Sequence, residues 1–146
     1  MKDIVNIKAG LHIDDRGLLS YINDIEGFNV QRLYVIENHK NEFIRAWHGH
    51  EKEEKIFFPI SGTFMLGTVR VENFSNPSST SIPTKFILSA QSPTGIHVPG
   101  GYANGLMNLT PDAKILVLSN SSLESSKNDD FRLPFDFWNI WEIEKR

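Results

Sequence analysis

The sequence predicts an all-β protein, built from short strands in a closed antiparallel barrel or a sandwich. Two observations support this prediction. Apolar runs of about four to eight residues recur along the chain with turn signals between them, and helical periodicity is almost absent. With 146 residues and 40% hydrophobic residues, the chain is large enough to bury a core, and we expect a single domain over residues 1–146.

The expected strands follow in chain order. Residues 1–8 alternate like a strand and contain no secretory apolar segment, which predicts a cytoplasmic protein. Further strands are expected over 18–22, 32–36, 43–47, 55–60, 64–71, 84–88, 95–98 and 114–118, where Ile, Val, Phe and Tyr are concentrated. Residues 14–17, 61–62 and 99–101 carry turn signals between them.

Two stretches differ from this pattern. The polar residues 73–83 predict a surface loop, because they are bounded by strand patterns on both sides. From about residue 119 to residue 146 the chain becomes a tail that is polar at first and then aromatic. Because aromatic side chains avoid water, we expect this tail to pack on the barrel or on a second subunit.

Composition excludes several classes of function. The chain contains no cysteine, so disulfides, thiolate nucleophiles and Cys-ligated zinc are excluded. Its net charge of -3 argues against a nucleic-acid surface, which needs a basic stripe. No apolar run is long enough to cross a bilayer, so no membrane partner is expected. A phosphate group would have to be held by local basic residues.

The densest group of reactive side chains is the stretch Arg45-Ala-Trp-His48-Gly-His50-Glu-Lys-Glu-Glu54-Lys55. On a strand with a period of two residues, His48, His50, Lys52 and Glu54 would point to one face. Two imidazoles and a carboxylate would then meet inside a barrel. A surface position on an edge strand is the competing interpretation, which the paired histidines make less attractive.

This stretch resembles the first motif of the cupin superfamily, a Gly-bounded His-x-His followed by Glu, matched here by His48-x-His50-x-x-x-Glu54 and ending at Gly62. The second cupin motif, Pro-x-Gly-x-x-His with Asn four residues later, is similar to residues 99–108, with Asn104 where the last metal-binding His would stand. The resemblance implies a cupin fold, that is, a double-stranded β-helix or jelly-roll barrel. An amide is a poor ligand for transition metals, and no cofactor is expected.

The chain also resembles two branches of that superfamily, the RmlC-like 3,5-epimerases of dTDP-4-keto-6-deoxy sugars and the WxcM-like dTDP-sugar 3,4-ketoisomerases. The epimerase motifs are matched in order by Asp14-Asp-Arg16-Gly, by Arg45-Ala-Trp-His48, by Lys55 and by residues 99–105. The ketoisomerase motifs are matched by residues 31–36 and 45–50, with a looser match at 130–132. The acid Tyr of the epimerases falls at Val117, which favours ketoisomerisation or epimerisation at one centre.

The resemblance implies an isomerase of a nucleotide-linked 4-keto-6-deoxy hexose that works by proton abstraction beside the ketone. It gives His48 the role of base, with Lys55 or Asn104 as donors to the developing oxyanion. Our own candidates for the second acid are Tyr34, His50 and Tyr102, in that order. The residues expected to bind substrate are Arg16, Arg32, Arg45, Lys55, Tyr102 and Asn104. A homodimer is also expected, since small cupins with exposed strand edges commonly pair.

Other interpretations stay open. A metal-dependent cupin enzyme would use His48, His50 and Glu54 as ligands, and a non-catalytic cupin would only bind a sugar or nucleotide. Individual residues also have structural interpretations: Tyr34 as a core aromatic with a satisfied hydroxyl, and Arg16 or Arg32 paired with nearby carboxylates.

Overall fold

The computed structural model describes residues 2–146, so that Met1 lies outside the described residues. Over this range the chain forms eleven strands and one short helix. In chain order they are β1 Val5–Asp14, β2 Gly17–Ile22, β3 Arg32–Glu37, β4 Ile44–His50, β5 Lys55–Ser61, β6 Thr63–Arg70, β7 Thr84–Ser89, β8 Thr94–Val98, β9 Tyr102–Asn108, β10 Lys114–Ser119, α1 Leu123–Lys127 and β11 Phe131–Arg132.

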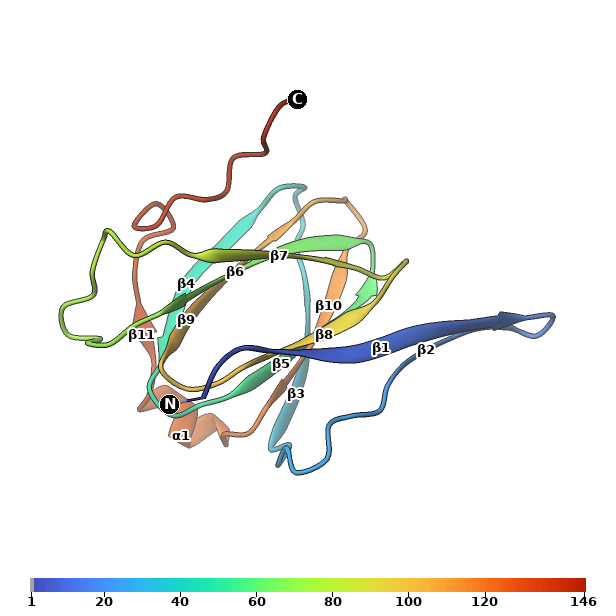
Figure 1. Cartoon of the computed structure of the whole chain (residues 1–146), viewed down its shortest axis with the longest axis horizontal. Coiled ribbons are helices and arrows are strands. Elements are labelled where there is room, and N and C mark those ends of the chain that lie inside the picture. Colours follow the sequence, from blue (N-terminus) through green and yellow to red (C-terminus); the bar gives the residue numbers. More distant parts are fainter. Residues whose placement is uncertain (1) are drawn as a thin grey trace.

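The strands form two antiparallel sheets that face each other as a jelly-roll barrel (Figure 1). One sheet has the order β2-β1-β8-β5-β10-β3, and the other has the order β11-β4-β9-β6-β7. The side chains between them form the main core, which includes Phe57, Phe64, Ile96 and Ile115. The all-β expectation is therefore confirmed.

One element at the start of the chain differs from the expected strands. The first strand begins at Val5 and continues to Asp14, well beyond the expected end at residue 8. It pairs with β2 through the expected turn at residues 14–17, where Gly17 has a positive φ of 139°. Figure 1 shows this β1–β2 hairpin projecting away from the other strands.

Strand β9 was not predicted, although it pairs with both β4 and β6 at the centre of its sheet. Its residues Tyr102–Asn108 are all buried, yet they include Ala, Asn and Gly, which have low intrinsic β propensity. Burial between two neighbouring strands overrides that preference. The polar loop expected over 73–83 does connect β6 to β7 without a strand of its own.

The end of the chain packs on the outer face of the β4-containing sheet. Trp138 and Trp141 are buried against Trp47, with ring centroids 5.4 and 5.2 Å from the Trp47 ring. The expectation that the aromatic tail packs on the barrel is confirmed. The tail also contains α1 and β11, which the sequence did not predict. Within residues 2–146 no helix combines the length and the apolar composition of a membrane span.

Candidate functional site

A cavity of about 400 Å³ opens between the edge strand β3 and the strand β4 of the opposite sheet. Four strands line it, and they bring together residues that are up to 72 positions apart in the chain, from Tyr34 to Leu106. The lining residues are Tyr34, Val35, Ile36 and Glu37 from β3, Arg45 and His48 from β4, Lys55 and Phe57 from β5, and Asn104 and Leu106 from β9. Five of the nine predicted site residues therefore meet in one place.

A bulge in β4 explains why Arg45 and His48 share this cavity. Arg45 pairs with Leu106 and His48 pairs with Asn104, so four residues of β4 oppose three residues of β9. One extra residue inverts the alternation of the strand. Arg45 and His48 consequently line the same cavity although they are three positions apart, and Trp47 between them is buried on the outer face.

His48 is surrounded by an environment that keeps its imidazole neutral. Burial lowers the pKa of His48 to about 4, with further lowering by the positive charges of Lys55 and Arg132, while Asp130 acts in the opposite direction. At neutral pH the ring is therefore uncharged: one nitrogen carries a proton and the other has a free lone pair. A neutral imidazole that lines a cavity is in the form that a general base requires.

Three polar side chains of the cavity have no hydrogen-bond partner among residues 2–146: the His48 ring, the Tyr34 hydroxyl and the Asn104 amide. Asn104 is only 5% exposed, so its amide is largely withdrawn from water. These groups are available to a ligand, and the structural interpretation of Tyr34 as a satisfied core residue is not supported.

Two cations complete the lining. The Lys55 ammonium lies 3.5 Å from a carboxylate oxygen of Glu53 and 6.0 Å from the centre of the Tyr34 ring. Arg45 lies at the exposed end of the cavity, where its Nε donates to Oδ1 of Asn38 at 2.6 Å. The Nη groups of Arg45 make no hydrogen bond in the described part of the chain, and they remain able to bind an anion.

His50 lies beside this cavity but is not part of its lining. It is 5% exposed, and its Nδ1 donates to the backbone oxygen of Asp129 at 2.6 Å. This bond places the proton on Nδ1, while the buried Nε2 atom has no partner in residues 2–146. Burial, followed by the charge of Lys55, lowers the pKa of His50, so this ring is also neutral at neutral pH.

The structure does not bring Arg16, Arg32 and Tyr102 to the cavity. Arg16 is exposed at the tip of the β1–β2 hairpin, where its guanidinium pairs with Asp14 and lowers the pKa of that carboxyl group. The side chain of Arg32 donates to Glu53 and to the backbone oxygen of Ser121.

Tyr102 is the third of these residues, and it points to another side of the barrel interior. Its hydroxyl accepts a hydrogen bond from Nη2 of Arg70 at 2.8 Å. Tyr102 lies two positions before Asn104 on β9, and therefore on the same face of the sheet, but it lines a different hollow. Its polar group is thus already satisfied within the protein.

The alternative metal triad of His48, His50 and Glu54 is not assembled. Strand β4 ends at His50, so the two-residue period does not continue to Glu54. The Glu54 carboxylate instead pairs with Nε2 of His97 at 2.7 Å and with Lys2 at 3.1 Å. No three His, Asp or Glu side chains are grouped as metal ligands anywhere in residues 2–146.

Two residues near the site were missed by sequence reasoning. The Glu53 side chain is fully buried between Arg32 and Lys55. The Asp129 carboxylate accepts the backbone N–H groups of residues 51, 52 and 53 at 2.7–2.9 Å, which holds the turn between β4 and β5. Both look like surface acids in the sequence, and only their distant partners distinguish them.

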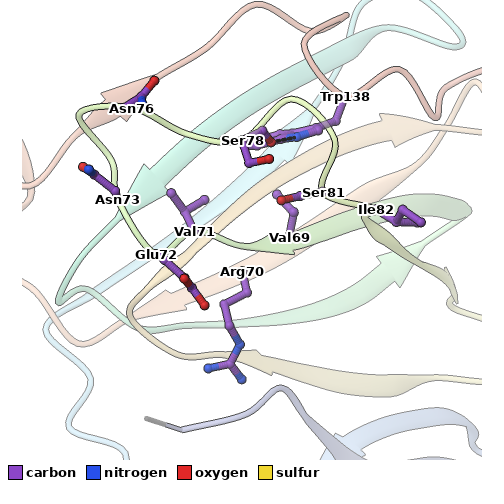
Figure 2. A pocket seen from close by; sticks show the side chains of 10 residues that line it. All are labelled: Val69, Arg70, Val71, Glu72, Asn73, Asn76, Ser78, Ser81, Ile82 and Trp138. Carbon is purple, nitrogen blue, oxygen red and sulfur yellow. Dashed lines mark hydrogen bonds between the residues drawn. The ribbon is translucent and has the colours of Figure 1, made fainter.

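A second cavity, of about 480 Å³, lies on the outer face of the β4-containing sheet, under the loop between β6 and β7 (Figure 2). Figure 2 shows Val69 on β6, Val71 just after the end of this strand, and Ser78, Ser81 and Trp138 across from them. Its lining contains no histidine and no lysine. This cavity therefore lacks a base of the kind that His48 supplies, and the cavity around His48 is the candidate site.

Comparisons with known proteins agree with this fold. The family model described as "FdtA: WxcM-like, C-terminal" matches residues 2–140. No curated protein matches the chain in sequence. Among solved structures, the QdtA sugar 3,4-ketoisomerase of Thermoanaerobacterium thermosaccharolyticum, in complex with TDP, is 18% identical with a TM-score of 0.71, covering 92% of this chain and 90% of that chain.

Two further structures are similar. The WlaRB TDP-quinovose 3,4-ketoisomerase of Campylobacter jejuni is 20% identical with a TM-score of 0.68, covering 94% of this chain and 98% of that chain. The 3'-monoepimerase ChmJ of Streptomyces bikiniensis, in complex with dTDP-quinovose, is 18% identical with a TM-score of 0.77, covering 97% of this chain and 77% of that chain. At these identities the likeness is one of fold, and the expected cupin jelly roll is confirmed.

Proposed function

The chain belongs to the FdtA family of WxcM-like, C-terminal proteins, and on that premise we propose that it is an isomerase of nucleotide-linked 4-keto-6-deoxy hexoses. The reaction we favour is 3,4-ketoisomerisation, with epimerisation at a single centre as the second candidate. The observation that carries the proposal is the cavity in which a neutral His48, the Lys55 ammonium, the Tyr34 hydroxyl and the Asn104 amide come together.

The first chemical step uses the acidity of the hydrogen beside the ketone. His48 removes the proton from C3, the C3–H bond breaks, and its electron pair forms the C3–C4 double bond of an enolate while the negative charge moves to O4. Lys55 and Asn104 donate to O4 as the charge develops there. The chemistry requires no cofactor, because a neutral imidazole and these donors supply the base and the charge stabilisation.

The second step decides the product. If O4 takes up the proton that the C3 hydroxyl gives up and a second proton is delivered to C4, the product is the 3-ketone with a 4-hydroxyl group. If a proton returns to C3 from the opposite face, the product is the C3 epimer. Val117, at the position of the epimerase acid, is buried and has no proton to give. Tyr34 pairs with Val117 on the adjacent strand, which makes its hydroxyl our candidate for the second acid.

The nucleotide end of the substrate requires a cation at the mouth of the cavity. Arg45 supplies one, since its Nη groups are uncommitted within residues 2–146. Arg32 is committed to Glu53, and we assign it no direct contact with the substrate. Arg16 lies on the projecting hairpin (Figure 1), so a role for it in substrate binding requires a second chain.

A homodimer is part of the proposal. Exposed apolar side chains lie at both edges of the six-stranded sheet: Leu18 and Leu19 on β2, and Leu33 and Val35 on β3. Monomeric proteins rarely leave such edges uncovered. A cytoplasmic location belongs to the same proposal, because a chain without cysteine needs no oxidising compartment.

The test is incubation with dTDP- and GDP-linked 4-keto-6-deoxy hexoses in heavy water, followed by NMR of the sugar. Deuterium at C4 with a 3-keto product indicates ketoisomerisation, and deuterium at C3 of an inverted sugar indicates epimerisation. His48→Asn should abolish deuterium entry in either case. Tight binding of the sugar nucleotide without deuterium entry would instead identify a binding protein, and activity that depends on an added metal ion would favour the metal-dependent alternative.

A further inference from the structure

A fully buried carboxylate lies next to the cavity without lining it. The Glu53 side chain has no solvent exposure, and its oxygens are 3.2 Å from Arg32 and 3.5 Å from Lys55. Burial acts to raise the pKa of Glu53, but the Ser126 hydroxyl and the positive charges of Lys55 and Arg32 outweigh burial, so that the pKa is lowered. Glu53 is therefore an ion, and a buried ion needs close partners.

The strand register explains how Glu53 has two cationic partners. Ser119 on β10 pairs with Arg32 on one side and with Lys55 on the other, so these three residues form a row across adjacent strands. Glu53 lies just before β5 and reaches both ends of the row. Arg32 is anchored independently, because its Nε donates to the backbone oxygen of Ser121 at 2.9 Å. Arg32 therefore holds the Glu53 carboxylate in place, and this carboxylate in turn holds the Lys55 ammonium.

Lys55 is the only member of this ion cluster that lines the cavity. A lysine side chain has several rotatable bonds and loses considerable entropy when it is held in one position. The Tyr34 ring, 6.0 Å from the ammonium, is a weak restraint in comparison with a carboxylate in a site from which water is excluded. Without Glu53, the ammonium would be free to swing out of the cavity toward solvent.

We propose that Glu53 is a positioning residue, whose buried carboxylate holds the Lys55 ammonium at the cavity wall beside Tyr34 so that it meets the keto oxygen of the bound sugar. The task of the ammonium rests on the proposed function, whereas its placement by Glu53 does not. Glu53 touches no substrate atom and acts only through Lys55. Glu51, on the same turn, is exposed and its side chain makes no hydrogen bond or ion pair within residues 2–146, so it serves as a matched control.

The placement is tested first by NMR relaxation of the lysine ε-methylene groups in the ligand-free protein. In the wild type, Lys55 should be more ordered than Lys85, which is exposed and has no ion pair in the described chain. Glu53→Gln should reduce the order of Lys55 to that of Lys85, and Glu51→Gln should leave it unchanged. A Lys55 that is as mobile as Lys85 in the wild type, or unaffected by Glu53→Gln, overturns the proposal.

The catalytic consequence is tested by kinetics on the keto sugar. Glu53→Gln should lower kcat roughly 10- to 100-fold, with a smaller change in KM, because a misplaced group loses rate more than binding. In a Lys55→Gln background the same substitution should change kcat by less than about twofold, since Glu53 has nothing left to position. Equal losses in both backgrounds would show a merely structural role and overturn the proposal.

A second variant covers the case in which Glu53→Gln does not fold, and the relaxation measurement covers the case in which the wild type is inactive. If Glu53→Gln fails to fold, Glu53→Asp keeps the charge but shortens the side chain by one methylene, and it should reduce the order of Lys55 in part. If the wild type converts no keto sugar, the proposed function fails, and the relaxation measurement still decides whether Glu53 places Lys55.

Discussion

Individual polar side chains around the barrel interior differ in whether they already have partners. Arg32 and Tyr102 are satisfied within the protein, by Glu53 and by Arg70 respectively. His48, Tyr34 and Asn104 have no hydrogen-bond partner among residues 2–146, and all three line one cavity. Because these three groups line one cavity and are not bonded within the described chain, they remain able to bind a ligand there.

The first prediction concerns the protonation of His48. NMR titration of the histidine rings should show His48 gaining its proton only near pH 4, because burial and the Lys55 charge disfavour the cation. Lys55→Gln should move this midpoint upward, since it removes one of the two leading causes. A His48 that titrates near the ordinary histidine value of about 6.5 would contradict the environment described here.

The same shift has a consequence for stability. The unfolded chain takes up a proton on this histidine near pH 6.5 and the folded chain only near pH 4. The contribution of the neutral His48 is therefore present above pH 6.5 and is lost as the pH falls through 4, by on the order of 3 kcal/mol. Denaturant unfolding at pH 7 and pH 4 should show a smaller difference for His48→Gln than for the wild type.

The second prediction separates catalysis from stability at Tyr34. Tyr34→Phe removes a hydroxyl that has no partner in residues 2–146, so the free energy of unfolding should change by less than about 0.5 kcal/mol. If the hydroxyl is the second acid, kcat should fall by about 100-fold or more. Tyr21→Phe, on the projecting hairpin, is the control and should leave kcat unchanged. Full activity of Tyr34→Phe would assign the acid to another residue.

At the scale of elements, the turn between β4 and β5 depends on a segment about 80 residues away. The Asp129 carboxylate accepts three successive backbone N–H groups of that turn, and its carbonyl accepts the proton of His50. The segment between α1 and β11 thus fixes both the turn and the tautomer of His50, which lies beside the cavity. This arrangement is why a polar stretch near the end of the chain bears on a motif near its middle.

The third prediction tests that connection. Asp129→Ala leaves three N–H groups without their acceptor and should reduce the free energy of unfolding by about 3 kcal/mol, because bonds to a charged acceptor are among the stronger ones. Asp130→Asn is the control, since Asp130 pairs only with the exposed Arg132 and should contribute less than about 1 kcal/mol. Urea denaturation measures both. Equal effects of the two substitutions would argue against the role of Asp129.

The fourth prediction concerns the docking of the aromatic tail. Gly67 and Gly105 are directly paired on neighbouring strands and leave room for the rings above them. A methyl group at Gly105 would lie 2.6 Å from the Cβ of Ala46 and 2.8 Å from the Trp141 ring. Gly105→Ala should therefore destabilise the protein by about 1–3 kcal/mol.

Its structural readout is limited proteolysis of the tail. Gly105→Ala should make the bonds after residue 133 more sensitive to cleavage and shift tryptophan fluorescence toward that of exposed rings. The control is Ile143→Ala, because Ile143 lies beyond Trp141 and is 49% exposed. A tail that is equally resistant in Gly105→Ala and in the wild type would contradict the close packing.

At the scale of the whole molecule, the fifth prediction concerns the oligomeric state. Light scattering should give twice the 16.6 kDa of one chain. Leu33→Asp places a charge on an apolar residue that is 59% exposed at a sheet edge, and it should shift the mass toward that of the monomer. Ile82→Asp is the control, since Ile82 is 90% exposed on the opposite loop. A monomeric wild type would remove the dimer from the proposal.

The sequence by itself predicted the all-β architecture and nine site residues, of which five line one cavity: His48, Tyr34, Lys55, Arg45 and Asn104. Both depend on short-range pattern, because alternation along a strand sets which face a side chain occupies, and the motif spacing carries the resemblance to cupins. The pattern also led to two errors. It extended the β4 period to Glu54, and it overlooked β9, whose residue types are poor strand formers.

Only the tertiary structure decided which of the charged residues serve the cavity. In the folded chain Arg32 pairs with Glu53, Arg16 lies at the tip of the β1–β2 hairpin, and the Asp129 carboxylate accepts three backbone N–H groups. The tertiary structure also placed the bulge that aligns Arg45 with His48. The physical reason is distance along the chain: these partners are tens of residues apart, and electrostatic pairing and strand register depend on which strands become neighbours, which no local pattern specifies.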